Sequence, residues 1–101
     1  MSESILQPQY PYKGKIPQDA KCYLCHMTAE CRHHIYPNGL RKVSEAHGFW
    51  VYLCHECHNL HRHSVHLNPE LMRRLKAECQ AKYEETHTRD EFMKLIGTNY
   101  L

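Results

Sequence analysis

The segment CHECHNLHRHSVH, residues 54–66, places two cysteines and five histidines within thirteen positions. Thiolates and imidazoles are the side chains that bind zinc and related transition metals. A second pair of cysteines with the same spacing lies upstream, in the CYLC of residues 22–25, and 28 residues separate the two pairs. Each CxxC pair directs two thiolates to one side of a tetrahedral ion. The spacing predicts one structural zinc held by Cys22, Cys25, Cys54 and Cys57, with disulfides or unligated thiols as the alternatives.

Six cysteines in a secreted chain would indicate disulfides, but the N-terminal segment has no charged-then-apolar signal pattern and contains several prolines. No apolar run approaches the roughly 18 residues of a membrane span. The 101 residues are expected to form a small soluble, cytoplasmic protein. Its hydrophobic core would be small, so a bound metal would add needed stability. Cys31 and Cys79 lack a CxxC partner and are expected to be buried free thiols.

The histidines need a role of their own, because a zinc ion with four cysteine ligands has no open position for a substrate. His33 and His34 are adjacent on a predicted strand, so their side chains should point to opposite faces. One of them could bind a metal while the other approaches a substrate from a different side. His58 follows the second cysteine pair and, in a helix, would be directed back toward the strands.

Such an arrangement suits the hydrolysis of a phosphodiester. A histidine with a pKa near neutrality can take a proton from water. A metal on neutral imidazoles keeps most of its charge and can stabilise the phosphate and the leaving group. The only acidic pair near this region is Glu30 and Glu56, which favours one catalytic metal over two.

A hairpin should position these side chains. Residues 1–20 are expected to form an irregular arm broken by prolines. Strands are predicted over 30–37 and 49–53. Between them, a turn over 36–39 and a short helix over 40–48 that ends at a glycine are expected. A further helix should begin within 57–63.

Two helices are predicted at the C-terminus. The segment 68–87 has Asn68 as its cap, Pro69 at its first position, and an apolar face formed by Leu71, Leu75, Cys79 and Tyr83. The segment 88–97 begins with the capping box of Thr88 and Glu91 and ends at a glycine.

The residues RHHIYP followed by LCHECHNLH resemble the HNH, or ββα-metal, endonuclease superfamily. The longer segments GLRKVSEAHGFWVYLCHECH and VHLNPELMRRLKAECQAKYEETHTRDEFMKLIGTNYL are similar to a phage-borne HNH family described as recombination enhancement, RecA-dependent nucleases. The resemblance covers roughly residues 21–101, which is more specific than an HNH match of about ten residues. It implies an α+β fold: a small zinc-stapled, treble-clef-like ββα-metal core followed by two packing helices, with the nuclease domain at 21–101.

Carried over by position, the resemblance implies that His34 is the general base. It implies that a catalytic Mg²⁺, Mn²⁺ or Zn²⁺ is held by His33, His58 and His66. By spacing alone, His61 competes with His66 as the third ligand.

The sequence departs from the family at the middle Asn of HNH, which usually lies just before the second strand. This chain has Gly48 and Phe49 there, and Asn38 and Asn59 are the available substitutes.

Arg41 and Lys42 are expected to contact DNA phosphates or, alternatively, to form a solvated helix face. The net charge of +2 is only a weak sign of nucleic-acid binding.

The expected function is that of a metal-dependent DNA endonuclease or nicking enzyme that uses one catalytic metal and serves phage recombination in a bacterial host. Its partners would be DNA and, as in some relatives, a RecA-type recombinase filament. The alternative is a zinc-stabilised module that binds nucleic acid or protein without cleaving. The adjacent His33 and His34 favour the enzyme, while the low charge and the missing Asn favour the module.

Overall fold

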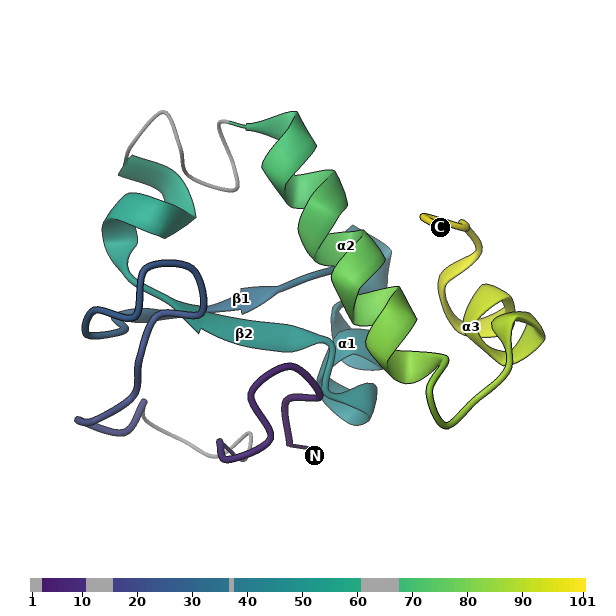
Figure 1. The fold of residues 1–101 in the computed structure, drawn as a ribbon, viewed down its shortest axis with the longest axis horizontal. Coiled ribbons are helices and arrows are strands. Elements are labelled where there is room, and N and C mark those ends of the chain that lie inside the picture. Colours follow the sequence, from purple (N-terminus) through teal and green to yellow (C-terminus); the bar gives the residue numbers. More distant parts are fainter. Residues whose placement is uncertain (1–2, 11–15, 37, 61–67) are drawn as a thin grey trace.

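The computed structural model describes residues 3–10, 16–36, 38–60 and 68–101. The elements follow one another in the order β1 (Cys31–His34), η1 (Asn38–Leu40), α1 (Arg41–His47), β2 (Trp50–Leu53), η2 (Glu56–Leu60), α2 (Pro69–Tyr83) and α3 (Arg89–Ile96). Figure 1 shows the two strands in the middle of the molecule, with α2 running diagonally across and α3 beyond it. The predicted α+β class is confirmed. No helix in these ranges has the length and apolar content needed to cross a membrane.

The two strands form an antiparallel pair in which Cys31 lies opposite Leu53 and His34 opposite Trp50. Because side chains alternate along a strand, each strand contributes to two faces. Val51 and Leu53 belong to the main core, whereas Trp50 and Tyr52 belong to a second buried cluster on the other face. The short sheet is therefore covered on both sides.

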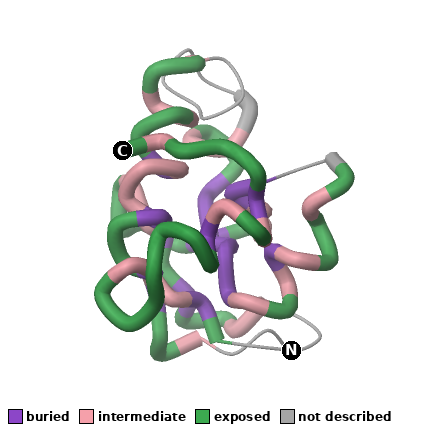
Figure 2. The backbone as a smooth tube through the Cα atoms, turned by 90° about the vertical axis from the view of Figure 1, so that its right-hand side faces the viewer, coloured by how far each residue is buried: buried purple, intermediate pink, exposed green. Residues whose placement is uncertain are grey.

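The main core lies between the sheet and the C-terminal helices. Its aromatic centre is Phe49, whose ring lies edge-on to the rings of Tyr36 and Tyr83 at centroid distances of 5.4 Å. The Tyr36 hydroxyl also donates to the Lys76 carbonyl at 2.6 Å, which attaches α2 to the end of β1. Figure 2 shows the buried segments gathered in the interior and the exposed ones around them. The core members are Cys22, Ile35, Tyr36, Phe49, Val51, Leu53, Cys54, Leu75, Cys79, Tyr83, Phe92 and Ile96.

The predicted caps at the starts of the two C-terminal helices and the glycine stop of the second are confirmed, whereas α2 ends at Tyr83, four residues before the predicted end at 87. The Asn68 side chain accepts a hydrogen bond from the Leu71 amide at 3.1 Å, and Pro69 is the first residue of α2. Thr88 and Glu91 form the reciprocal capping box of α3. These caps satisfy amides that the first helical turn leaves without a helical acceptor.

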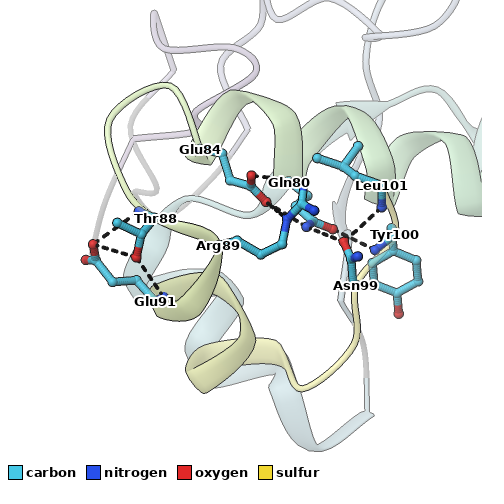
Figure 3. A network of polar contacts seen from close by, with 8 residues as sticks. All are labelled: Gln80, Glu84, Thr88, Arg89, Glu91, Asn99, Tyr100 and Leu101. Carbon is cyan, nitrogen blue, oxygen red and sulfur yellow. Dashed lines mark hydrogen bonds and ion pairs between the residues drawn. The ribbon is translucent and has the colours of Figure 1, made fainter.

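The last residues of the chain are attached to α2 by one buried amide. Gln80, which is fully buried, donates through Nε2 to Asn99 Oδ1 at 2.8 Å and to Glu84 Oε2 at 2.7 Å. Its Oε1 accepts from the Tyr100 amide at 2.7 Å. Figure 3 shows this network together with Arg89, which pairs with Glu84 at 3.2 Å. The network fixes the end of the chain beside α2.

The described parts of the N-terminal arm have neither helix nor strand, as predicted, but they pack closely against β2. The Ser4 hydroxyl donates to the Trp50 carbonyl at 2.5 Å. Gln7 accepts from the Tyr52 amide at 2.8 Å and donates to the Lys21 carbonyl at 2.9 Å. Both side chains are buried. The arm thus supplies hydrogen bonds to the Trp50 carbonyl and the Tyr52 amide on the free edge of β2, a role that its composition did not reveal.

Gly48, which ends α1, lies against this arm. Its replacement by alanine is expected to destabilise the fold by about 2 kcal/mol or more. Its φ of 76° is left-handed, which costs a residue with a Cβ about 1–2 kcal/mol. A Cβ would also overlap the Glu3 carbonyl. Denaturant unfolding followed by the fluorescence of Trp50 measures the effect.

Gly97→Ala is the matched control. Its φ of 87° is also left-handed, but none of the described atoms would lie within 4 Å of a Cβ there. Gly97→Ala should therefore cost only the conformational strain. Equal losses for the two variants would show that the arm does not pack against Gly48.

Candidate metal centre and histidine site

The four cysteines of the two CxxC pairs lie close together. Their sulfur atoms all lie within 4.8 Å of one another, and the Cys25 and Cys54 sulfurs are 3.6 Å apart. Two members of the set are buried, one is half-buried and one, Cys25, is exposed. The predicted grouping of these cysteines is confirmed.

The first pair lies on a tight turn between two short extended segments. Lys21 and Thr28 form an antiparallel bridge, and the Cys22 amide donates to the Met27 carbonyl at 2.7 Å. His26 closes the turn with a left-handed φ of 65°, a conformation that histidine adopts more readily than β-branched residues. The turn directs the Cys22 and Cys25 sulfurs to the same side.

The second pair lies where β2 ends and η2 begins. Cys54 directly follows the last residue of β2, and its carbonyl accepts from the His58 amide at 3.0 Å. The Tyr23 amide donates to the Tyr52 carbonyl at 2.8 Å, which attaches the first pair to the end of β2. Figure 1 shows the blue loop of residues 20–29 and η2 at the same end of the sheet.

The donor set fits a zinc ion. With Zn–S bonds of about 2.3 Å, tetrahedral geometry places sulfurs about 3.8 Å apart. The 3.6 Å between Cys25 and Cys54, and the 4.8 Å limit for the whole set, agree with this requirement. The four cysteines could therefore hold a structural metal such as zinc.

The acidities of the thiols show why a cation would stabilise the cluster. Burial raises the pKa of Cys57, and hydrogen bonding with the Cys54 and Cys22 thiols raises it further. Burial also acts to raise the pKa of Cys22, but backbone amides outweigh this effect and leave that pKa below its ordinary value. One thiolate in the cluster thus makes the formation of a second thiolate less favourable. A divalent cation would remove the repulsion between the two negative charges.

Cys31 and Cys79 lie outside the four-sulfur cluster. Cys79 is fully buried, as predicted, whereas Cys31 is only half-buried and points its sulfur at the Leu53 carbonyl at 3.1 Å. Burial, followed by the nearby Cys54 and Cys22 sulfurs, raises the pKa of Cys31 to about 11. This thiol therefore stays protonated at neutral pH.

His33 and His58 come together from different elements. His33 is buried on β1, and its ring lies edge-on to the ring of His58, with the centroids 5.3 Å apart. His58 belongs to η2, one residue beyond Cys57. The cysteine cluster holds the start of η2 at the end of the sheet, and this placement brings the two imidazoles into contact.

His34 lies on the opposite face of β1, as the alternation of strand side chains predicts. Its Nε2 is 3.1 Å from Oε1 of Glu45 on α1. The His34 side chain is 13% exposed and that of Glu45 is 31% exposed, so solvent reaches the pair. Glu45 was not identified from the sequence, because nothing in the spacing of the two residues shows that α1 packs beside β1.

Arg32 was likewise not identified from the sequence. It shares the His34 face of β1, and its guanidinium lies over the rings of Trp50 and Tyr52 at 5.5 and 5.3 Å. It also donates to the Tyr52 hydroxyl at 3.1 Å. The aromatic rings hold a positive charge on the same face as His34.

The remaining predicted site residues have different positions. Arg41 and Lys42 are exposed in the first turn of α1. The predicted ligand His66 and its competitor His61 lie outside the described residues. Of the two asparagines, Asn38 begins η1 and Asn59 lies in η2.

Comparison of the chain with models of protein families, with curated proteins and with solved structures gives no match.

Proposed function

We propose that the chain is a metal-dependent DNA endonuclease or nicking enzyme with a zinc-stapled, treble-clef-like ββα-metal core. The observation that carries the proposal is the contact between His33 and His58, at 5.3 Å between ring centroids, beside the cysteine cluster. An adjacent histidine, His34, lies on the other face of the same strand. The resemblance of RHHIYP and LCHECHNLH to HNH nucleases assigns chemistry to these same residues.

The proposed catalytic metal would be held by neutral imidazoles. His33 and His58 supply two of them, and His66 remains the predicted third ligand. A divalent ion bound there would supply positive charge that stabilises the phosphate and the leaving oxygen. The structural zinc has a different role: the four cysteines fix η2, and with it His58, at the end of the sheet.

The proposed base is His34, and Glu45 is proposed to position it. With Nε2–H donating to Glu45, the Nδ1 of His34 keeps its lone pair and can accept a proton from water. Arg32, on the same face, adds a positive charge that favours a bound phosphate.

The DNA surface is proposed to include the first turn of α1. Arg41, Lys42 and Glu45 follow one another at helical spacing, so the two cations neighbour the carboxylate that pairs with His34. Phosphates contacted by these cations would lie close to the proposed base.

Replacing Arg41 and Lys42 together by alanine is expected to reduce the slope of log K against log salt by up to about two units. The reason is that each phosphate neutralised by a cation displaces about one counterion from the DNA, and the variant neutralises two phosphates fewer. Fluorescence anisotropy with a labelled duplex at several salt concentrations measures the slope. The control is Arg73→Ala with Arg74→Ala, which removes two exposed cations from α2. An effect confined to the control would place the DNA surface on α2.

The activity itself is tested by plasmid nicking with zinc-loaded protein in the presence of Mg²⁺, Mn²⁺ or added Zn²⁺. Conversion of supercoiled to open-circular DNA that depends on the added metal is expected. Absence of metal-dependent cleavage of supercoiled, linear duplex and single-stranded DNA would overturn the proposal.

A zinc-stabilised binding module without cleavage is the second candidate. The burial of His33, which is 3% exposed, favours it, because a packed pair of rings also stabilises a fold. Such a module would bind DNA with salt-dependent affinity yet leave every DNA form uncut in the nicking assay.

A further inference from the structure

One residue of the cysteine cluster is exposed to solvent. Cys25 is exposed, whereas Cys22 and Cys54 are buried and Cys57 is half-buried. A surface cavity of about 290 Å³ lies beside it, lined by Cys25, Met27, Thr28, Glu30, Cys54 and Glu56. A small reagent in this cavity would lie against two of the four proposed zinc ligands, Cys25 and Cys54.

The Cys54 sulfur is well placed to react with that of Cys25. The Cys25 and Cys54 sulfurs are 3.6 Å apart, so they would approach by roughly 1.5 Å to form a disulfide of about 2.05 Å. The two residues come from different parts of the chain, the first turn and the end of β2. A disulfide between them would join these parts directly, in place of the proposed zinc.

We propose that Cys25 is an oxidation site for a small neutral peroxide such as hydrogen peroxide, and that Cys54 is its resolving cysteine. The proposal rests on the zinc site proposed above and adds a regulated state to it. Reactive cysteines are partly exposed and react as thiolates, and Cys25 bound to zinc would be an exposed thiolate.

The reaction is balanced with one peroxide per zinc site. The Cys25 thiolate attacks a peroxide oxygen, the O–O bond breaks, and a sulfenic acid and hydroxide form. The Cys54 thiolate then attacks the sulfenic sulfur, so the S–S bond forms and a second hydroxide leaves. Two electrons pass from the sulfurs to the peroxide, and two protons from solvent convert the hydroxides to water. Two thiolates remain for the zinc, too few for a closed site, and the ion is released.

The charges around the cavity select the class of reagent. Glu30 and Glu56 line it, and four thiolates around one zinc ion would add a net charge of about −2. Anionic oxidants and anionic disulfides would be repelled, whereas neutral ones would enter. We therefore expect the neutral 4,4′-dithiodipyridine to react with Cys25 about tenfold faster than the anionic 5,5′-dithiobis(2-nitrobenzoate).

The main test follows zinc release from the full zinc-loaded chain after addition of hydrogen peroxide, with a chromophoric zinc chelator and peptide mapping by mass spectrometry. One zinc released per chain oxidised is expected, with Cys25–Cys54 as the first disulfide. A first disulfide between Cys22 and Cys25, or between Cys54 and Cys57, would overturn the proposal.

Three variants sharpen the result. Cys25→His can hold zinc with three thiolates and one imidazole, and it should release zinc at least about tenfold more slowly. Cys31→Ser removes the nearby thiol that is not a ligand and should release zinc at the wild-type rate. Met27→Leu removes a thioether from a residue that is 69% exposed, and an unchanged release rate in this variant is expected.

The outcomes also separate this proposal from the function proposed above. Release at the wild-type rate from Cys25→His, or slowing only by Met27→Leu, would overturn the oxidation site and leave the nuclease proposal standing. If Cys25→His failed to hold zinc, the disulfide mapping of the wild-type chain would decide by itself. A chain that bound no zinc before oxidation would contradict both the proposed zinc site and the release of zinc that depends on it.

Discussion

His34→Ala is expected to lower the rate of metal-dependent DNA cleavage by about 10²–10⁴-fold, the usual contribution of a general base. The variant should retain DNA binding and both metals, because His34 lies on the face of β1 opposite His33 and His58. Single-turnover nicking measures the rate, and metal analysis and fluorescence anisotropy measure the retained properties.

Three further variants make this result specific. Glu45→Gln keeps a side chain beside His34 but removes its charge, so a smaller loss of rate than in His34→Ala is expected. His58→Ala should lose activity by a different route, through reduced occupancy of the catalytic metal, and excess Mn²⁺ should partly restore it. His55→Ala removes an exposed histidine of the same region and should cleave at the wild-type rate.

Cleavage by His34→Ala at the wild-type rate would remove His34 from the proposed mechanism. The base would then be sought at His33. The variant leaves all four cysteines untouched. Loss of the structural zinc in His34→Ala would therefore show damage to the fold, not loss of the base.

Cys54→Ser is expected to abolish zinc binding and cooperative folding together. Zinc binding contributes of order 10–16 kcal/mol in small zinc domains, which is comparable with or larger than the whole stability of a typical domain. Cys54 is central to this coupling, because it directly follows β2 and its sulfur lies 3.6 Å from that of Cys25. Circular dichroism during denaturant titration, with the zinc content of the same sample, measures both effects.

Cys79→Ala is the matched control for this prediction. Cys79 is buried, like Cys54, but it lies outside the four-sulfur cluster. The variant should keep one zinc per chain and unfold cooperatively, with a loss of stability of only about 1 kcal/mol for the missing sulfur. Cooperative unfolding of fully reduced, zinc-free wild-type protein would contradict the proposed coupling of metal and fold.

Much of the local structure could be predicted from the sequence because its causes lie within a few residues. Asn68 caps α2, Thr88 and Glu91 cap α3, and Gly48 ends α1 in a left-handed conformation. Each of these features depends on a hydrogen bond or a φ angle within one helical turn. The helix predicted to begin within 57–63 starts slightly earlier, since η2 covers Glu56–Leu60, and its geometry is of the π type.

The grouping of the four cysteines was also predictable, although the two pairs are far apart in the sequence. A CxxC pair directs both of its sulfurs to one side and so supplies two of the four ligands of a tetrahedral zinc ion. In a small chain with two such pairs, the second pair is the natural source of the other two ligands. The relative exposure of the four sulfurs was not predictable. It depends on how the turn of residues 22–28 lies against the end of β2, and this position leaves Cys25 exposed while Cys22 is buried.

The grouping of the four cysteines, the helix caps and the opposite directions of His33 and His34 all follow from residue spacing or from strand alternation, so the order of residues is enough to predict them. Three other features depend on tertiary packing: Glu45 lies beside His34, Ser4 and Gln7 bind β2, and Gln80 holds the last residues. These contacts join residues 11 to 46 positions apart in the sequence. They form only when packing of the apolar core brings the elements together, and no local pattern of residues records which polar side chains will then face one another.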